Sequence, residues 1–400
     1  MPGAAVSSSI SALSKRQQQL LAILRSSLPR VPALRLFQHH APTVAKYLVC
    51  LLFLLNWRSW PFVWHFRIFR PVFVIRLSYR WMKLRTLFSS RTIQAIEEDR
   101  WGDALAPIGE NPIAMVVPYN TSATMDDCDF NLHLSNSSYA KTLDGARFKA
   151  ALLMFPHFFR AGGWMPLAVT HYHFIHEIPI FAKYEVRTSV AAWDQKWLYL
   201  ICKFVTKKDP KKSKKPNQAG SLPPASGESF AASVRIPADE VSSTVTPLTN
   251  GSPNGSTEVD TQAALQAVTA ELFPNDGDDE NVTLHTVSVS QLCFKVGRLT
   301  VPPAVALACN GFSIPPPAGE APYSRERPPP HWPQAKLIMS VPAGGSTKKL
   351  RQLMQGGWKD VPEDKRFWDK ALGGVIEDRR KRNLVLLEAM RTGLSHARTM

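Results

Sequence analysis

A helical stripe followed at once by three strand-like runs most constrains the fold of this 400-residue chain. From Tyr139 to Leu153, apolar residues recur at intervals of three or four, which predicts a largely buried helix that ends near Phe155. Three runs rich in β-branched and aromatic residues follow it: LAVTHYHFIHEI, FAKYEVRTSVAAW and WLYLICKFVTK. One buried helix followed by antiparallel strands predicts an α+β fold.

The connections between these runs favour a meander of neighbouring strands. Asp194 and Gln195 stand between Trp193 and Lys196, where they predict a tight hairpin. Much further along the chain, TLHTVSVSQLCFKVG alternates apolar and polar residues and predicts one more strand of the same sheet.

A polar tract, residues 207–280, separates the two parts of the predicted sheet. It begins with KKDPKKSKKPN, is rich in Pro, Gly, Ser and Asn, and has few large apolar residues. Such a tract buries too little surface to offset the entropy of ordering, so we predict a disordered insertion. FAASVRI, from Phe230 to Ile236, is a candidate transient strand within it.

These composition changes divide the chain into six predicted parts. They are an N-terminal extension that is partly disordered (1–43), a basic aromatic segment (44–100), the first part of the folded domain (101–206), the disordered insertion (207–280), the closing strand with a short helix (281–312), and a proline-rich linker with C-terminal helices (313–400). In the last part, the spacing of apolar residues from Val375 to Leu387 predicts a helix that covers part of the core.

The first hundred residues, which include the basic aromatic segment, hold most of the net charge of +16, because fifteen Lys and Arg precede Trp101 against three acidic residues. An excess of this kind usually indicates an anionic partner. The apolar run from Tyr47 to Leu55 is too short to cross a bilayer, which needs about twenty apolar residues. The sequence FRIFRPVFVIRLSYRWMKLRTLF then places Arg and Lys at near-helical spacing among large apolar residues, as interfacial helices do.

We therefore expect residues 44–88 to contact membrane lipid. An internal membrane such as the endoplasmic reticulum, with the folded domain in the cytosol, is the expected location. Whether residues 44–66 span the bilayer or only lie on it is left open. The alternative is a helical layer packed on the folded domain with solvated Arg side chains.

Neither the cysteines nor the histidines indicate a metal site or another cofactor. The five cysteines form no CxxC pair and no regular spacing. His171 and His173 would share one face of a strand, whereas His176 falls on the opposite face. No Cys or carboxylate completes a ligand set, so we expect no metal and no cofactor.

The segment MDDCDFNLHLSNSSYAKTLDGARF, residues 125–148, resembles the hot-dog thioesterases. The similarity is to the branch that contains 4-hydroxybenzoyl-CoA thioesterase and the membrane-associated thioesterase-superfamily proteins of animals and fungi. The matching residues are Asp127, Asp129, His133, Asn136, Tyr139, Leu143, Asp144 and Arg147. A second match, FKVGRLTVPP from Phe294 to Pro303, looks like the closing strand and the Pro-led short helix of the fungal members.

The resemblance implies a hot-dog fold, in which a curved antiparallel sheet wraps a long central helix. It also implies a homodimer with acyl-thioester sites at the interface between the protomers. The substrate would be an acyl group carried by coenzyme A or by a carrier protein. The chain departs from the family at Ser135, where the commoner form has adjacent asparagines.

Thioester hydrolysis needs a carboxylate that activates water or attacks directly, and hydrogen-bond donors for the developing oxyanion. By match to the family, Asp129 is the candidate base or nucleophile. Asn136 is the second candidate catalytic residue, since it can cap the helix and fix the free N–H groups at the helix start, which would polarise the carbonyl. The candidate substrate-binding residues are His133, Ser137, Ser138 and Tyr139. The structural alternatives are an Asx turn at Asp129 and a purely backbone-bonding role for His133.

The predicted function is therefore a membrane-attached acyl thioesterase. The alternative is a non-catalytic acyl-thioester-binding or scaffold protein on the same fold, which the departure at Ser135 leaves open. A hot-dog dehydratase would need a second catalytic His, and we find none in a suitable position in the sequence. We expect no nucleic acid partner. Proteins that bind nucleic acid show basic patches without an apolar run such as Tyr47 to Leu55, which phosphate binding does not require.

Overall fold

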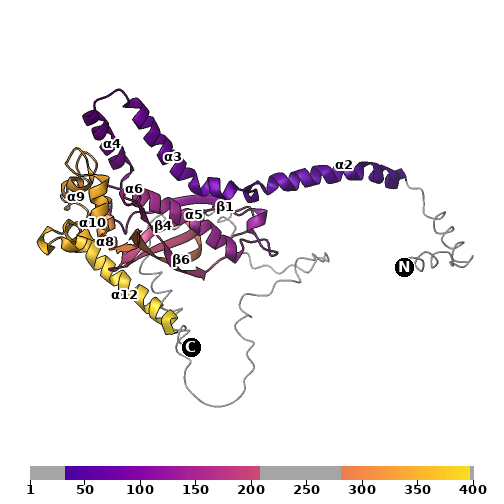
Figure 1. Cartoon of the computed structure of the whole chain (residues 1–400). Coiled ribbons are helices and arrows are strands. Elements are labelled where there is room, and N and C mark those ends of the chain that lie inside the picture. The colour runs from indigo at the N-terminus through magenta and orange to yellow at the C-terminus, as the bar shows by residue number, and fades with distance from the viewer. Residues whose placement is uncertain (1–31, 208–280, 397–400) are drawn as a thin grey trace, which may run out of the picture. The chain divides into compact units, whose positions relative to one another are not determined.

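The computed structural model describes residues 32–207 and 281–396 (Figure 1). The chain divides into two compact units, one that ends at Trp60 and one that begins at Pro61. The predicted insertion after Lys207, with its candidate strand from Phe230 to Ile236, lies outside the described residues.

The first unit contains α2 (Pro32–Leu55) and the short helix η1 (Trp57–Ser59). The apolar run from Tyr47 to Leu55 forms the last part of α2, where its side chains are exposed. The indole N–H of Trp60 donates to the carbonyl oxygen of Phe53 at 2.9 Å, and the two rings stack with centroids 4.4 Å apart. Among the described residues, no helix combines the length and the apolar content that crossing a membrane requires.

In the second unit, the described residues form a seven-stranded antiparallel sheet in the order β1-β4-β5-β6-β2, with β3 and β7 also paired to β6. The strands are β1 (Val117–Ser122), β2 (Gly163–Trp164), β3 (Leu167–Phe174), β4 (Lys183–Trp193), β5 (Trp197–Lys207), β6 (Val282–Val296) and β7 (Leu299–Val301). The four predicted strand runs are all confirmed as strands, although β3 ends four residues before its run does. β1 was not predicted, because Pro118 and Asn120 are poor strand formers.

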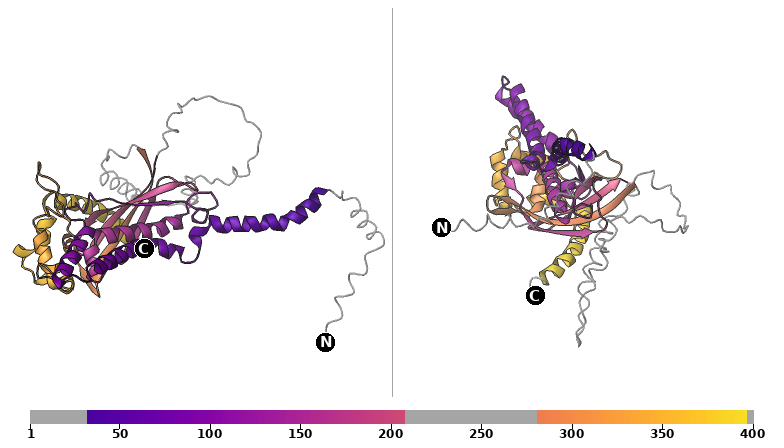
Figure 2. Two further views of the ribbon diagram at one scale, coloured as in Figure 1. Left: turned by 90° about the horizontal axis from the view of Figure 1, so that it is seen from above. Right: turned by 90° about the vertical axis from the view of Figure 1, so that its right-hand side faces the viewer.

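The hairpin between β4 and β5 has the predicted turn. Oδ1 of Asp194 accepts the backbone N–H groups of Lys196 at 2.7 Å and Trp197 at 2.6 Å, so the side chain fixes the turn. Register shifts between Val190 and Ala192, and again on β5, introduce bulges. Bulges increase bend and twist, and the sheet is accordingly curved (Figure 2).

The predicted central helix is α5 (Asn136–Met154), which packs on β1 and β4. Its buried stripe includes Tyr139, Leu143, Ala150 and Met154, which the periodicity selected. Leu153, which the periodicity also selected, is exposed. The short helix α6 (Pro156–Arg160) follows directly. A long helix against a curved antiparallel sheet confirms the expected α+β, hot-dog arrangement.

The remaining helices lie around this core. They are α3 (Val63–Arg85), α4 (Arg91–Leu105), η2 (Met125–Asp127), α8 (Pro303–Cys309), α9 (Trp332–Met339), α10 (Thr347–Met354), η4 (Gly357–Asp360), η5 (Glu363–Lys365), α11 (Phe367–Ala371) and α12 (Gly374–His396). α8 begins at Pro303, as the match to FKVGRLTVPP predicts. α12 lies on β4, where Ile376 and Leu387 are buried and the Asn383 side chain donates to the carbonyl of Ala191 at 2.7 Å. The predicted C-terminal covering helix is confirmed.

α3 packs on the folded domain, as in the alternative given for the basic aromatic segment, and it also exposes large apolar side chains. On one side it packs against α5, where the rings of Phe69 and Phe148 meet edge to face with centroids 5.7 Å apart. On the other side large apolar residues such as Leu77 and Trp81 are exposed.

Candidate functional site

The loop that leads into α5 is a tight hairpin. The backbone N–H of Asp129 donates to the carbonyl of His133 at 2.9 Å, and the N–H of Ser135 donates to the carbonyl of Asp127 at 3.0 Å. The N–H of Leu134 donates at 2.8 Å to the carbonyl of Ile178, in the loop after β3. These bonds hold the candidate acid directly in front of the helix start.

The N-cap of α5 is Ser135, not Asn136 as the sequence suggested. Both residue types cap helices well, and here the extended backbone of Ser135 places the boundary one residue earlier. The Ser135 hydroxyl donates to Oγ of Ser138 at 2.9 Å, and its oxygen makes no capping hydrogen bond with a backbone N–H. Within the described residues, no protein group accepts from the backbone N–H of Asn136 or Ser137.

These two N–H groups lie at the positive end of the helix dipole. Asn136 and Ser137 are both exposed, so a ligand can approach their amides from solvent. The arrangement can hold an anionic oxygen. Asn136 thus contributes a backbone donor rather than a capping side chain.

Asp129 has one occupied and one open carboxylate oxygen. Its Oδ1 accepts the backbone N–H of Asn131 at 2.9 Å, so the Asx turn that was the structural alternative is present. In the described part of the chain, Oδ2 has no protein hydrogen bond. The side chain is 33% exposed, and the turn leaves its outer oxygen available to a substrate or a water molecule.

His133 lies between two carboxylates. Its Nδ1 is 3.6 Å from Oδ1 of Asp129, and its Nε2 is 2.9 Å from Oε2 of Glu177. The alternative in which His133 bonds only backbone does not hold, because its ring also contacts the Glu177 carboxylate. Sequence reasoning missed Glu177, since it assigned this residue to the strand that in fact ends at Phe174.

Asp127, the first acid of the D-x-D pair, is a buried residue that supports the loop. The Thr124 hydroxyl donates to its Oδ2 at 2.6 Å, and Nζ of Lys141 lies 3.1 Å from its Oδ1. With both oxygens engaged, this carboxylate ties the loop to α5. The two acids of the motif thus have different surroundings, and only Asp129 has an open oxygen.

Ser138 and Tyr139 lie beneath the exposed part of the site. Both are buried, and the Tyr139 ring packs against Phe174 and Phe204 with centroids 5.1 Å and 5.0 Å away. Burial raises the pKa of the Tyr139 hydroxyl, which stays neutral at physiological pH. The structure therefore brings Asp129, His133, Asn136 and Ser137 together at the surface, with Ser138 and Tyr139 behind them.

Exposed apolar side chains border this surface. Phe130, Leu132 and Phe181 are all exposed, and Phe130 is 83% exposed. The two loops that carry them are joined, because the N–H of Ile180 donates to the carbonyl of Leu132 at 2.8 Å. Exposed groups of this size usually mark a binding surface.

Comparisons with known proteins find thioesterases among the relatives of this chain. Residues 123–231 match the family described as the Thioesterase-like superfamily. A probable thioesterase of Saccharomyces cerevisiae is 27% identical over 173 residues, which are 42% of this chain and 67% of that protein. A probable thioesterase of Emericella nidulans is 26% identical over 175 residues, which are 38% of this chain and 52% of that protein.

Solved structures are similar at much lower sequence identity. The structure of a probable thioesterase from Escherichia coli matches with a TM-score of 0.28 and 6% identity, over 48% of this chain and 94% of that chain. The matched part of this chain spans between about half and two thirds of the length of the two curated relatives named above.

Proposed function

We propose that this chain, whose residues 123–231 match the thioesterase-like superfamily, hydrolyses an acyl thioester at the N-terminal end of α5. One observation carries the proposal. A carboxylate with an open oxygen, Asp129, precedes a helix start where the N–H groups of Asn136 and Ser137 have no acceptor in the described part of the chain. These are the base or nucleophile and the oxyanion donors that acyl transfer needs.

In the proposed reaction the thioester carbonyl oxygen accepts hydrogen bonds from the amides of Asn136 and Ser137. Oδ2 of Asp129 removes a proton from water, whose oxygen attacks the carbonyl carbon. The C–S bond then breaks, the leaving thiolate takes the proton from Asp129, and the products are a carboxylic acid and a thiol. His133 and Glu177 act on the position of the loop that carries Asp129. Direct attack by Asp129, followed by hydrolysis of the anhydride, gives the same products.

The substrate is proposed to be an acyl-CoA or an acyl-carrier thioester. The test is a thiol-release assay of the full chain over a panel of acyl-CoAs and acyl-carrier proteins of different chain length. We expect Asp129→Asn to reduce hydrolysis at least 100-fold while acyl-CoA binding is retained. Asp126→Asn, at a nearby exposed acid, is the matched control and should keep most of the activity.

Two outcomes would refute this function. Binding of acyl thioesters by the unaltered chain without any thiol release would favour a non-catalytic binding or scaffold protein. Unchanged hydrolysis by Asp129→Asn would show that the Asp129 carboxylate takes no part in the reaction.

A homodimer is part of the proposal. β3 is an edge strand, and it exposes Leu167, Val169 and Phe174. An exposed apolar edge is a template for pairing with another strand, and a second copy of β3 would cover it. Val169→Lys should then shift the chain from dimer to monomer in analytical ultracentrifugation, and a dimer that resists this change would argue against pairing through β3.

Membrane attachment is proposed through α3, at an internal membrane with the folded domain in the cytosol. The support is the exposed apolar face that includes Phe73, Leu77 and Trp81, with Arg76 and Arg80 beside it in sequence. We expect the full chain to sediment with vesicles that contain anionic lipid, and Leu77→Glu to reduce this binding several-fold. Equal binding of Leu77→Glu and the unaltered chain would contradict attachment through α3.

A further inference from the structure

Only three residues other than glycine have a positive φ in the part of the chain that the structure describes. They are Phe62, Leu132 and Phe181, with φ values of 66°, 65° and 63°. In this left-handed region Cβ lies too close to the following carbonyl oxygen, so glycine or asparagine is its usual occupant. A large apolar residue there is an outlier, and backbone strain of this kind collects at functional sites.

The three strained side chains are also exposed. Phe62 is 70% exposed, Phe181 63% and Leu132 61%. Packing inside the chain therefore does little to offset the strain. A contact with a molecule outside the chain is the simplest reason to keep a large apolar side chain at each of these positions.

Leu132 and Phe181 lie on two loops that hydrogen bonds hold together. The N–H of Ile180 donates to the carbonyl of Leu132 at 2.8 Å, and the N–H of Phe181 donates to the carbonyl of Ala123 at 2.9 Å. Phe130, on the same loop as Leu132, is more exposed than either. We call Phe130, Leu132 and Phe181 the apolar rim, because they border the proposed thioester site.

The first turns of α3 lie on the strand that leads to the apolar rim. Nη2 of Arg67 donates to Oγ1 of Thr121 in β1 at 3.4 Å, and Ala123, which bonds Phe181, follows two residues later. Phe62, the third strained residue, directly precedes α3. All three strained residues therefore belong to elements that meet at the end of β1.

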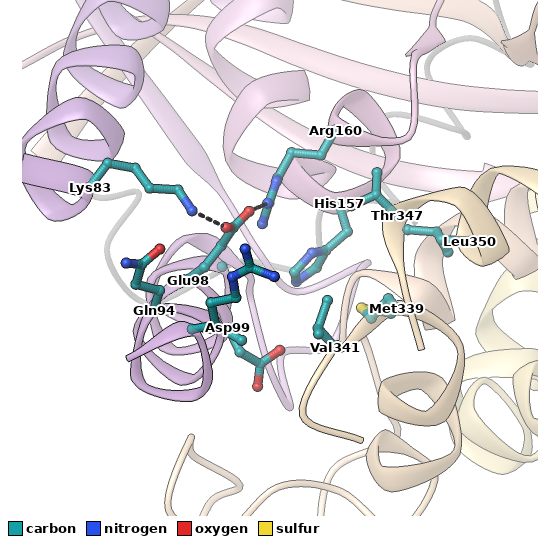
Figure 3. A pocket seen from close by; sticks show the side chains of 13 residues that line it. Lys83, Gln94, Glu98, Asp99, His157, Arg160, Met339, Val341, Thr347 and Leu350 are labelled. Carbon is teal, nitrogen blue, oxygen red and sulfur yellow. Dashed lines mark hydrogen bonds and ion pairs between the residues drawn. The ribbon is translucent and has the colours of Figure 1, made fainter. Parts of the chain in front are cut away.

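The other end of α3 is fixed to the folded domain as well. Nζ of Lys83 lies 2.6 Å from Oε2 of Glu98 in α4, and Oε1 of the same carboxylate lies 2.6 Å from Nη2 of Arg160 in α6 (Figure 3). The indole N–H of Trp101 in α4 also donates to the Ser78 hydroxyl of α3 at 3.1 Å. These contacts hold α3 in a fixed position relative to the apolar rim.

The charge of α3 indicates what kind of surface it meets. The helix contains six Lys and Arg and no acidic residue, and Phe66, Phe73 and Leu77 are exposed on it. Cations beside exposed apolar groups match a membrane surface, where the cations meet anionic headgroups and the apolar groups enter the boundary with the acyl chains. Contact between α3 helices of two copies would instead bring like charges together.

We propose that the apolar rim, with Phe62, is a second membrane-contact surface that enters the headgroup region of the bilayer that α3 lies on. The rim side chains are uncharged, so they bind lipid by apolar burial, which salt does not screen. One consequence rests on the proposed function. The mouth of the thioester site would face lipid, and thioesters whose acyl chain lies in the bilayer would reach Asp129.

The test is co-sedimentation of the full chain with vesicles of phosphatidylcholine, with and without phosphatidylserine, at low and high salt. The variant carries Leu132→Gly and Phe181→Gly together. Glycine favours both backbone conformations, so the double variant should fold. We expect it to partition about 10-fold more weakly onto both kinds of vesicle, at both salt concentrations, because two large apolar side chains no longer leave water.

Leu337→Ala is the matched control, because Leu337 of α9 is 61% exposed, as Leu132 is. It should partition as the unaltered chain does. The weakening caused by Leu77→Glu reports on α3 separately. Vesicle binding requires no hydrolysis, so a chain without thioesterase activity would still test the apolar rim.

Three results would overturn the proposal. One is equal partition of the double glycine variant and the unaltered chain. Another is a loss of the same size in Leu337→Ala, or a loss in the double variant that appears only at low salt. The third is a double variant that sediments as a monomer where the unaltered chain is a dimer, because a second copy would then cover the rim.

Discussion

Nε2 of His133 lies 2.9 Å from a carboxylate oxygen of Glu177. The contact joins the loop before α5 to the loop after β3, and a backbone bridge between His133 and Pro179 reinforces it. The other ring nitrogen of His133 faces Asp129. Glu177 therefore contacts the proposed base Asp129 only through His133. It should affect the reaction by holding the imidazole of His133 in place.

Replacing Glu177 by Ala should lower kcat about 3- to 10-fold, with a smaller change in KM. The stability change should stay below about 1 kcal/mol, because the Glu177 side chain is 69% exposed and exposed ion pairs contribute little. Steady-state kinetics and urea unfolding measure the two effects. Glu363→Ala, at an exposed acid that pairs with Arg366, is the matched control. A loss as large as that of Asp129→Asn would mean that Glu177 takes part in the chemistry itself.

The helix and the strands could be predicted because their apolar periodicity is a local property. β5 has the bounds of its predicted run, and α5 has its predicted buried stripe except for the exposed Leu153. The partner of His133 could not be predicted in this way, because Glu177 reaches it through pairing between distant loops. A pocket that α4 and α6 line together with α9 and α10 was missed for the same reason, since these helices are distant in the sequence.

The boundary at the start of α5 shows a finer limit. Ser135 and Asn136 have nearly equal capping preference, so only the backbone conformation decides between them. Asp129 could be singled out by its match to a family motif. The sequence could not predict which of the two acids has an open oxygen. The fold engages both oxygens of Asp127 and leaves Oδ2 of Asp129 open.

Leu132 should be a source of backbone strain in the site loop. Its φ is 65°, in the left-handed region that costs a residue with a side chain about 1–2 kcal/mol. Leu132→Gly should therefore stabilise the chain, by less than about 1 kcal/mol once the added freedom of the unfolded glycine is counted. Urea unfolding measures the difference.

Gly297→Ala is the reverse change and serves as the control, because it adds a side chain at a positive φ. Its φ is 62°, and nothing lies within 4 Å of a methyl group placed there. Gly297→Ala should therefore destabilise the chain by about 1 kcal/mol through backbone strain alone. A destabilising Leu132→Gly would show that the side chain of Leu132 makes contacts that outweigh the strain.

Arg147 should be the most costly polar residue of α5 to remove. Its guanidinium donates to the Thr170 hydroxyl at 2.8 Å, the Ser290 hydroxyl at 2.9 Å and the Asp144 carboxylate at 2.6 Å. Arg147→Met leaves the buried Ser290 hydroxyl with a weaker partner and should destabilise the chain by about 2–4 kcal/mol in urea unfolding. Asp144→Asn should cost less than about 1 kcal/mol, because this carboxylate is mostly exposed. Similar losses from both changes would contradict a buried role for the guanidinium.

Stability should fall as the pH drops below about 6.5, and two buried histidines should account for part of the fall. Burial lowers the pKa of His157 to about 3 and that of His331 to about 4, against about 6.5 in the unfolded chain. Above pH 6.5 each ring is neutral in both states, and no stability is lost. Below it the unfolded chain takes up a proton that the folded chain does not, so stability decreases by up to about 1.4 kcal/mol per pH unit for each ring.

The window of this effect runs from about pH 6.5 down to about pH 4 for His331 and about pH 3 for His157. Urea unfolding at several pH values between 7.5 and 4.5 measures the slope. His331→Phe removes one titrating ring at a position that already stacks on Phe367, and it should make the slope shallower by about half of the contribution of the two rings. An unchanged slope in this variant would mean that His331 takes up its proton in the folded chain as readily as in the unfolded one.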